Sequence, residues 1–556
     1  MVRYVALAHN RREGAKTRAE VLLNLGREDR LDTDGLRRLV GSLTRYLGDA
    51  PTAAGQDAPA VGSGPSLEDL DILASKPLGA VWLLDGLWRR LGIADALRAA
   101  VGGRRFTTDV ERVLFALVAN RALDPCSKLA AAEWASHDVA IPGLDAMDED
   151  QAYRAMDLLV DADVEGEVQR AVFFAAADLL NLEVDLLLFD TTSTYFERDT
   201  EEPDGGLRRY GHSKDSRPDL PQIVIGLAVT REGIPVRVWV WPGNSNDNSV
   251  LPQVKDDLRG WRLGRVVTVV DRGFSSKDNL DYLRRAGGHW IAGEKMRDGA
   301  AEHKAALSRQ GRYQPVRDNL RVKEIRLDDE GQRRFIVCHN PVEAERDRAR
   351  RDDTIARLEA ELDRIDAARN RLAKAKPGAR RDREAAAHTK AECALRDHPT
   401  LGRYLRQLKN GRLRIDRAKV TTEARLDGKF LLSTSDPDLS AADVALSYKN
   451  LLEAERGFRD LKSTLELRPV FHRLAHRIHA HVLLCWLALL LIRVAERSTQ
   501  QTWRRIATDL SRLHEVTVAF NAGTVTCTST LTDAHAGLFR ACNITPPPRI
   551  THLHPA

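Results

Sequence analysis

Residues 184–197 read VDLLLFDTTSTYFE, an apolar run that ends in an acidic residue and a polar stretch. Continuous apolar runs are typical of central strands that are buried on both faces. The segments IVIGLAV, IPVRVWVW and RVVTVV follow within the next 75 or so residues, and the second of these alternates in the two-residue period of a strand. Ser275 or Ser276 can then cap a helix that reaches Arg285, before the short strand HWIAG. The pattern predicts an α/β core over residues 183–295, in which three early strands form a meander and helix-covered strands follow.

Two acidic residues stand where buried strands of this core end. Asp190 follows LLLF, and Asp271 follows RVVTVV and precedes a turn that contains glycine. A carboxylate at the end of a buried strand is poorly placed for packing and well placed for a functional site. For Asp190 alone, a role in capping the next turn is an equally good explanation. Because Asp271 repeats the arrangement of an acid at the end of a buried strand, a functional role is the better explanation for the pair.

A third candidate lies in SYKNLLEAERGFRDLKSTLELRP, residues 447–469. Tyr448, Glu455 and Lys462 are seven residues apart, and seven helical steps of ~100° return to within ~20° of the starting direction. The three side chains therefore share one face of the predicted helix. A solvated polar face is the alternative, but the apolar segment HAHVLLCWLALLLI that follows indicates burial nearby.

The region before the core divides in two. Residues 1–62 are predicted to hold a β-hairpin, and the Ala-, Gly- and Pro-rich stretch 48–65 is predicted to be a linker. Residues 66–180 are predicted to be helical, with a capping box from Thr108 to Glu111. Two short helices, Ser127–Ser136 and Asp150–Leu159, are compatible with a helix-turn-helix, but their long connection favours an ordinary helical bundle.

After the core, residues 296–425 form a charged insertion in which the sheet pattern lapses. A heptad pattern predicts helix from about Val342 to Ala375, either as a helical hairpin or short coiled coil, or as a solvated helix packed on the core. Residues 426–556 are predicted to complete the core, with the strand KFLLSTS, two long helices over Ala441–Glu496, and a tail hairpin around Asn521 and Gly523.

The composition sets broad limits on function. The chain has 556 residues, of which 43% are hydrophobic and 30% charged, which fits a soluble globular protein of several domains. The net charge of +5 permits a nucleic-acid partner without requiring one. The six cysteines include no CxxC pair, which argues against a zinc ribbon. The apolar run Val482–Ile492 is too short to cross a bilayer, and the N-terminus lacks a signal-peptide pattern, so we expect no membrane partner and a cytoplasmic, nucleoid-associated protein.

These motifs resemble the DDE transposases of bacterial insertion sequences, in the group with the signature Tyr-x2-Arg-x3-Glu-x6-Lys. Tyr448, Glu455 and Lys462 fall on that signature in register, and FDTTSTYFE, DRGF and ERGFRDLKSTLELRPVFHR are similar to further text of the group. The similarity covers roughly residues 183–495, while VLLNLGR near the N-terminus fits less well. Leu451 occupies the position of the signature Arg, whose phosphate contact Arg456 or Arg459 would have to replace.

The resemblance implies an RNase H-like catalytic core interrupted by a mainly helical insertion. It implies that Asp190 on the first strand, Asp271 on the fourth and Glu455 on a late helix converge on two Mg²⁺ ions, which Mn²⁺ could replace. Tyr448, Lys462 and Arg459 are then expected to bind DNA phosphates. The implied partners are double-stranded DNA with terminal inverted repeats, target DNA and a second copy of the chain in a synaptic dimer.

Other basic and aromatic residues are candidates for contact with DNA. Arg272, Lys295, Arg468 and His472 could reach the backbone, although a surface charge is the more common role of such residues. Trp290 could stack a base, but a core position suits it better.

The sequence leaves three alternative functions open. The first is a nuclease on the same fold that lacks strand transfer, and the second is a catalytically inactive DNA-binding derivative, against which the presence of all three acids speaks. A coiled-coil scaffold is the third and explains only residues near 341–375.

Overall fold

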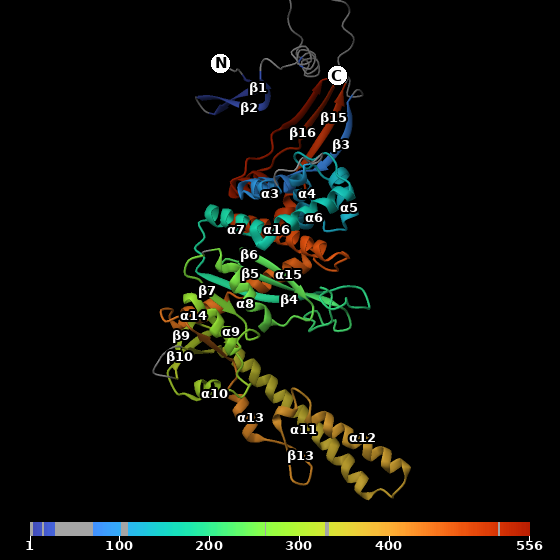
Figure 1. Cartoon of the computed structure of the whole chain (residues 1–556), viewed down its shortest axis with the longest axis vertical. Coiled ribbons are helices and arrows are strands. Elements are labelled where there is room, and N and C mark those ends of the chain that lie inside the picture. The colour runs from blue at the N-terminus through green and yellow to red at the C-terminus, as the bar shows by residue number, and fades with distance from the viewer. Residues whose placement is uncertain are drawn as a thin grey trace, which may run out of the picture.

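The structure is a computed structural model, which describes residues 4–13, 16–27, 40, 70–101, 109–261, 263–327, 333–520 and 523–555. The linker predicted at 48–65, the cap at Thr108 and the turn residue Asn521 lie outside these residues. Figure 1 shows an elongated molecule, in which a terminal sheet, a helical layer, a large sheet and a helical arm follow one another along the long axis.

A nine-stranded sheet in the order β6-β5-β4-β7-β8-β14-β11-β10-β9 forms the centre of the protein. Strands β4 (Leu186–Tyr195), β5 (Gln222–Thr230) and β6 (Pro235–Pro242) are antiparallel neighbours, which confirms the predicted meander. Strands β7 (Val267–Val270) and β8 (His289–Glu294) continue parallel to β4. Helix α8 (Asp247–Arg259) connects β6 to β7 and helix α9 (Lys277–Arg284) connects β7 to β8, and Ser276 caps α9 as expected.

The sheet also extends into the region where its pattern was expected to lapse. Strands β9 (Gln314–Arg317), β10 (Leu320–Arg326) and β11 (Arg334–His339) continue it beyond β14 (Lys429–Thr434), and α10 (Ala301–Ser308) lies between β8 and β9 in the chain. The expectation was therefore wrong for residues 314–339. Their charges concealed them, because the outward side chains include ion-paired Glu324 and Arg326, while Arg334 is buried against Glu324 at 2.8 Å.

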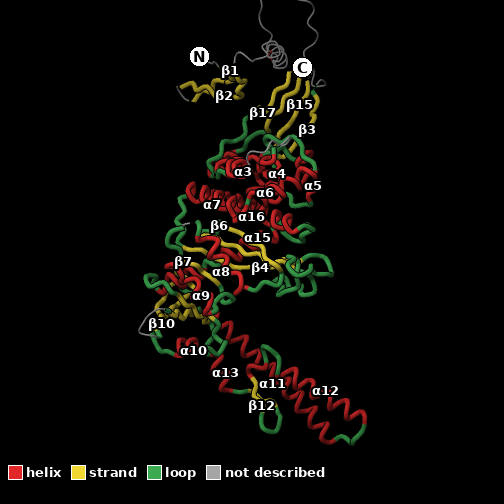
Figure 2. Tube along the Cα trace, viewed as in Figure 1, coloured by secondary structure: helices red, strands yellow, loops and turns green. Residues whose placement is uncertain are grey.

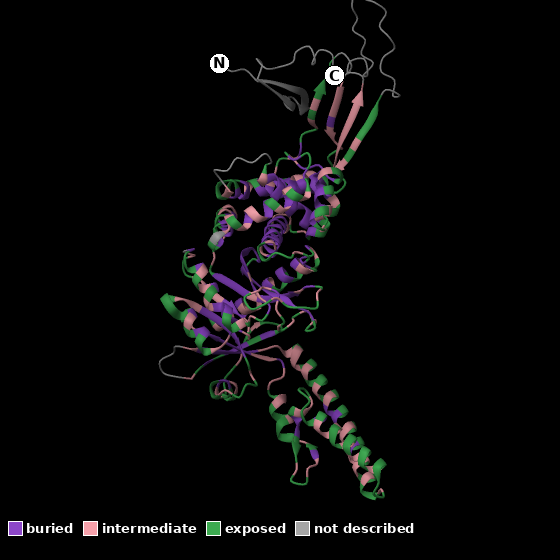
Figure 3. Cartoon of the chain, turned by 45° about the vertical axis from the view of Figure 1, so that its right-hand side comes forward, coloured by how far each residue is buried: buried purple, intermediate pink, exposed green. Residues whose placement is uncertain are grey.

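A helical arm leaves the sheet after β11. Helix α11 (Pro341–Lys374) confirms the predicted helix and pairs with α12 (Ala379–Arg396), and β12 (Leu405–Gln407), β13 (Leu413–Ile415) and α13 (Arg417–Ala424) complete the arm. The heptad residues Ile355, Leu358 and Ile365 form a small core of the arm itself, together with Leu395 and Tyr404. Figure 3 shows the arm as largely exposed, so α11 is a helix of a projecting hairpin and is not packed on the main core.

The helical layer comes from both ends of the chain. It contains α2 (Gly79–Arg90), α3 (Ile93–Val101), α4 (Val110–Leu123), α5 (Lys128–Glu133), α6 (Glu149–Ala162) and α7 (Glu167–Leu180). Helix α16 (Ala475–Thr499) runs among them and contacts α4 and α6, as Figure 2 also shows. It is long and apolar enough to cross a membrane, with a mean hydropathy of 2.0, but 94% of that apolar window is buried inside the protein. This confirms the interpretation of Val482–Ile492 as a buried helix.

Beyond this layer lie two further sheets, a two-stranded hairpin from the N-terminal residues and a four-stranded sheet that joins strands far apart in the chain. The predicted N-terminal hairpin is present as β1 (Tyr4–Glu13) and β2 (Lys16–Arg27), and the tail hairpin as β15 (His514–Phe520) and β16 (Gly523–Thr528). Strands β3 (Asp71–Pro77) and β17 (Ile550–Pro555) flank the tail hairpin in a four-stranded sheet of the order β17-β16-β15-β3, and neither was predicted. Strand β3 lies in a region expected to be helical, and its partner β15 is more than 400 residues away in sequence. The short helices α17 (Trp503–Leu510) and α18 (Asp533–Ala541) lie beside the tail strands in the chain.

The segment predicted as two long helices is divided into three. Helix α14 (Ala441–Lys449) ends before α15 (Leu452–Ser463), and α16 follows. Backbone hydrogen bonds three residues apart span the junction, from the Leu451 amide to the Tyr448 carbonyl at 3.1 Å and from the Ala454 amide to the Leu451 carbonyl at 3.0 Å. The chain therefore tightens into one turn at Asn450–Leu451, and Tyr448 and Glu455 belong to different helices.

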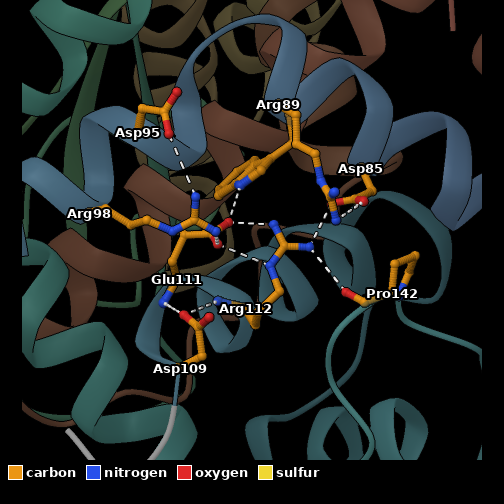
Figure 4. Close-up of polar contacts among 9 residues, drawn as sticks. Asp85, Arg89, Asp95, Arg98, Asp109, Glu111, Arg112 and Pro142 are labelled. Atoms are coloured by element: carbon orange, nitrogen blue, oxygen red, sulfur yellow. Dashed lines mark hydrogen bonds and ion pairs between the residues drawn. The ribbon is translucent and has the colours of Figure 1, made fainter. Parts of the chain in front are cut away.

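A buried ion network holds the helical layer together (Figure 4). The guanidinium of Arg112 donates to Glu111 and to Asp85, the latter at 2.6 Å, and also to the carbonyl of Pro142 at 3.2 Å. Glu111 accepts further hydrogen bonds from Trp88 and Arg98. Burial by itself raises the pKa of Glu111, but these partners, led by Arg112, more than offset that effect and lower it. The network joins α2, α3 and α4 and satisfies its charges, which a buried ion pair requires.

We predict that Arg112→Ala destabilises the helical layer by about 3 to 5 kcal/mol, because it removes the buried cation shared by Asp85 and Glu111 and leaves them only the largely exposed Arg89 and Arg98. Hydrogen exchange of the α2–α4 amides measures this locally. Arg154→Ala is the control, since Arg154 is 76% exposed and 3.8 Å from Asp150, and it should change stability by less than about 0.5 kcal/mol. Equal protection in both variants would contradict the role given to the network.

Candidate active site

The alternation of side chains along β4 and β7 sets the position of two acidic residues. Leu186 and Leu188 of β4 and Val267 and Val269 of β7 belong to the large core beneath α14, α15 and α16. Phe189 and Val270 belong to the separate core on the opposite face, beneath α8 and α9. Because side chains alternate along a strand, Asp190 and Asp271 both fall on the side of α14 and α15. Phe189 and Val270 are register partners in the parallel pair, so the two acids that follow them are neighbours.

Asp190 lies in a crowded acidic environment. The Lys214 ammonium is 4.0 Å from its Oδ1 and 3.6 Å from Oδ1 of Asp247, and the Thr191 amide donates to Asp190 at 2.7 Å. Burial raises the pKa of Asp190 to about 6; Asp271 and Asp247 add to the rise, and Lys214 opposes it. One lysine therefore does not neutralise the negative charge gathered here.

Asp271 is held from α14. The hydroxyl of Tyr448 donates to its Oδ1 at 2.7 Å, and burial together with the charge of Asp271 raises the pKa of this phenol. The phenol crosses β8 at Gly293, where any Cβ would collide with the Tyr448 hydroxyl. A glycine at this position of the strand therefore permits the contact between Tyr448 and Asp271.

Asp271 and Glu455 line the same cavity, which has a volume of about 530 Å³ and is also lined by Arg272 and Tyr448. Glu455 is exposed, and within the described residues its carboxylate has no hydrogen-bond or ion-pair partner. Among all the residues that the structure describes, no three His, Cys, Asp or Glu side chains lie close enough together to hold a metal ion. The structure thus brings Asp271 together with Asp190 and with Glu455, but the three carboxylates do not converge on one ion in this geometry.

Lys462 has a partner that the sequence did not reveal. Its ammonium is 2.7 Å from Oδ1 of Asp215, which the Arg468 guanidinium also contacts at 2.7 Å. Burial lowers the pKa of Lys462, and Asp215 opposes that shift. Asp215 therefore bridges α15 and the segment after it to the loop that also carries Lys214.

The remaining candidates differ in how accessible they are. Arg459 is exposed and has no side-chain partner among the described residues, whereas Arg456 contacts Glu496 at 2.9 Å. Leu451, at the signature Arg position, is buried with 6% exposure. Trp290 is 2% exposed in the core, as expected.

Sequence inspection missed Lys214, Asp215 and Asp247 at this site. Asp247 opens α8, accepts a hydrogen bond from the Thr191 hydroxyl at 2.5 Å, and lies against Gly273 just after Asp271. The polar stretches GHSKDSRPD and GNSNDNS carry these residues without a strand or helix period. The only available signal was the gathering of charge in loops beside strand ends.

Comparisons with known proteins give two family matches. The model described as a transposase DDE domain matches residues 186–491, which is more than half of the chain, and the N-terminal domain of the IS1634 family transposases matches residues 1–55. None of the curated proteins matches. Among solved structures, a piggyBac transposase synaptic complex with hairpin DNA, studied by cryo-electron microscopy, is 11% identical, with 78% of this chain and 79% of that chain covered and a TM-score of 0.34.

The pairing of Lys462 with Asp215 predicts an energetic coupling. Asp215→Asn should lower stability by about 3 kcal/mol, because it leaves two cations without their anion. Lys462→Met should cost less, about 1 kcal/mol, since Arg468 still neutralises Asp215. In the double variant the two costs should not add, with a coupling of about 0.5 to 3 kcal/mol in a denaturation cycle.

The control for this cycle is Asp219→Asn, which removes an exposed partner of Arg217 and should leave stability nearly unchanged. Additive costs for Asp215 and Lys462 would mean that the lysine is free of Asp215 in solution.

Proposed function

This chain belongs to the DDE transposase family, and from this we propose that it cuts and rejoins DNA at the ends of a bacterial insertion sequence, with Asp190, Asp271 and Glu455 as its catalytic carboxylates. The observation that carries the proposal is the position of Asp271, which is next to Asp190 in strand register and lines one cavity with Glu455. The strand order β6-β5-β4-β7-β8 also agrees with the RNase H-like core proposed for the chain, with Asp190 on its first strand and Asp271 after its fourth.

The residues present fit a pair of Mg²⁺ ions. Asp190 and Asp271 supply hard oxygen ligands, and Lys214 is the one cation within 4.0 Å of the Asp190 and Asp247 carboxylates among the described residues. Such carboxylates suit Mg²⁺ or Mn²⁺, which take few protein ligands and complete their shells with water and phosphate oxygens. When bound, two such ions would lower the cost of activating a water or a 3′-hydroxyl and of releasing the leaving oxygen.

The protein's own side chains hold this arrangement in place. Tyr448 orients the Asp271 carboxylate through its hydrogen bond, and Lys214 moderates the repulsion between Asp190 and Asp247. Glu455 stands one turn into α15 and has no competing partner among the described residues, so its carboxylate can turn toward Asp271. Phosphodiester chemistry depends mainly on such positioning and charge placement.

DNA phosphates are proposed to contact α15 and the wall of the cavity that Asp271 and Glu455 line. Arg459 is exposed and unpaired in the described chain, and therefore suits the contact that Leu451 cannot make. A phosphate contact from Lys462 competes with Asp215, and one from Tyr448 uses an oxygen whose proton is donated to Asp271. We therefore assign the strongest phosphate contact of the three to Arg459.

The partners proposed are double-stranded DNA with terminal inverted repeats, target DNA and a second copy of the chain in a synaptic dimer. We propose that residues before about 180 read the terminal repeats, because phosphate contacts at the catalytic core carry no sequence information. Helix α16 shares its core with that region, so the test uses the full chain, with hydrogen exchange measured with and without terminal-repeat DNA. Repeat-specific protection confined to residues after 180 would contradict this assignment.

The alternative function is an RNase H-like nuclease without strand transfer. Both enzymes would cut DNA with the same carboxylates, so products in which transposon ends are joined to target DNA decide between them.

We predict that Glu455→Gln keeps DNA binding but reduces both cleavage and joining by at least about a thousandfold, since it removes a metal-binding charge with little change of shape. Cleavage and joining are measured on labelled terminal-repeat DNA with Mg²⁺ or Mn²⁺. The matched control is Glu453→Gln on the same helix, since Glu453 lies 3.8 Å from Arg456 and outside the cavity. Normal activity of the Glu455 variant would show that the catalytic assignment is wrong.

A further inference from the structure

A second cavity, of about 530 Å³, lies between the helical layer and the segment that follows α15. Its wall includes Arg121 of α4, Lys128 of α5 and Arg477 of α16, and from the intervening segment Arg468, Phe471 and Arg473. It shares no lining residue with the cavity of Asp271 and Glu455. Five of these six side chains are cationic.

Two of the cations are buried without a carboxylate. Lys128 is 4% exposed and Arg121 is 3% exposed. Arg121 donates to the carbonyl of Cys126, but its Nε is buried without an acceptor. Among the described residues, the Lys128 ammonium has neither a hydrogen bond nor an ion pair. Burial lowers the pKa of Lys128 to about 7, and the charge of Arg121 adds to this effect.

The other buried lysine and arginine side chains of the described residues each have a hydrogen-bond or ion-pair partner. Lys323 is 8% exposed and donates to the carbonyl of Arg309. Each of the following buried arginines meets at least one carboxylate: Arg112, Arg208, Arg237, Arg334 and Arg493. A buried charge without a partner is costly. Lys128 is the exception, and the adjacent Arg121 has only the Cys126 carbonyl and the Asn120 amide oxygen as acceptors, which indicates that a partner of opposite charge arrives from outside the chain.

Neighbouring groups leave the cavity positive. Glu466 is the one acid among the described lining residues, and it is exposed. Asp157, which lies behind Arg477, is neutralised by bidentate hydrogen bonds at 2.9 Å. Burial lowers the pKa of His472 to about 4, with Lys128 and Arg121 adding to the shift, so this histidine is neutral and adds no charge of its own.

The mouth of the cavity carries features suited to a nucleic acid. Phe471 is 75% exposed, which is unusual for a phenylalanine. Arg473 is exposed beside it, and its side chain has no partner in the described part of the chain. Arg468 connects the cavity to α15, because it shares Asp215 with Lys462. An aromatic ring next to a cationic cavity matches the way proteins hold an unpaired strand.

We propose that this cavity binds a backbone phosphate of a DNA strand, with Lys128, Arg121 and Arg473 around the phosphate and Phe471 stacked on an adjacent unpaired base. The proposal rests on the proposed function, since it assigns the cavity to the DNA that the catalytic carboxylates cut. It predicts that part of the substrate strand leaves the duplex and is held between α5 and the segment after α15.

The test measures the salt dependence of DNA binding by the full chain. Lys128→Met and Arg473→Ala should each reduce the slope of log affinity against log salt by about 1 and weaken binding roughly tenfold at low salt. Phe471→Ala should leave the slope unchanged and weaken binding only to DNA with unpaired nucleotides beside the terminal repeat. Lys323→Met is the matched control. It also removes a buried lysine, but Lys323 lines neither this cavity nor the cavity of Asp271 and Glu455, so the slope should not change.

Stability provides a second readout, which separates this role from a structural one. Lys128→Met should raise the thermal midpoint, since it removes an unpaired buried charge while weakening DNA binding. Unchanged salt slopes for Lys128→Met and Arg473→Ala, in a chain that still cuts DNA, would overturn the proposal and leave the proposed function standing. Slopes that fall as expected in a chain that never cuts DNA would support the cavity and refute the function.

A third experiment distinguishes a DNA phosphate from free inorganic phosphate as the ligand of the cavity. Inorganic phosphate that raises the thermal midpoint of the unmodified chain but not of Lys128→Met, with DNA slopes unchanged, would assign the cavity to small anions and overturn the proposal. Competition between inorganic phosphate and DNA, lost in Lys128→Met, would support it.

Discussion

The two-residue alternation of side chains along the central strands is the constraint on which the rest of the structure depends. Because β4 and β7 are buried on both faces, each successive side chain enters one of two separate cores. A shift of one residue would exchange the two sets and move Asp190 and Asp271 to the face of α8 and α9. The register therefore determines at the same time which helices cover the sheet and which helix can bring a third carboxylate to the acids.

Charge distinguishes the functional regions from the merely buried ones. In the helical layer, Arg112 has two carboxylates and a carbonyl to contact, and the charges of that network are satisfied internally. Around Asp190 the carboxylates outnumber the available cations, and around Lys128 the cations lack an anion. These two imbalances have opposite sign and each costs stability in the free protein. The proposed metal ion at the first and the proposed phosphate at the second would each remove one of these costs.

The sequence was most informative where local periodicity and burial agree. The meander of β4, β5 and β6, the cap at Ser276, helix α11 and the buried α16 follow from patterns within a few turns or one strand. Strands β3 and β9 could not be predicted in this way. β3 pairs with a strand at the other end of the chain, and β9 lies at a charged sheet edge. Likewise, the ends of β4 and β7 pointed to Asp190 and Asp271, whereas Lys214 and Asp215 come from a loop whose partners are determined only by tertiary folding.

The position of Leu451 connects the helix junction with the chemistry proposed for the site. An unbroken helix would align Tyr448, Glu455 and Lys462 on one face, but the tight turn at Asn450–Leu451 separates Tyr448 from the other two. Leu451 is buried at that turn, where it packs in the large core and also lines the cavity of Asp271 and Glu455. The apolar residue thus anchors the junction of α14 and α15, which keeps Tyr448 on Asp271 and leaves Glu455 at the cavity. Because leucine cannot bind a phosphate, the phosphate contact proposed for this family position requires a residue outside the signature, and our proposal assigns it to the exposed Arg459, one turn beyond Glu455 on α15.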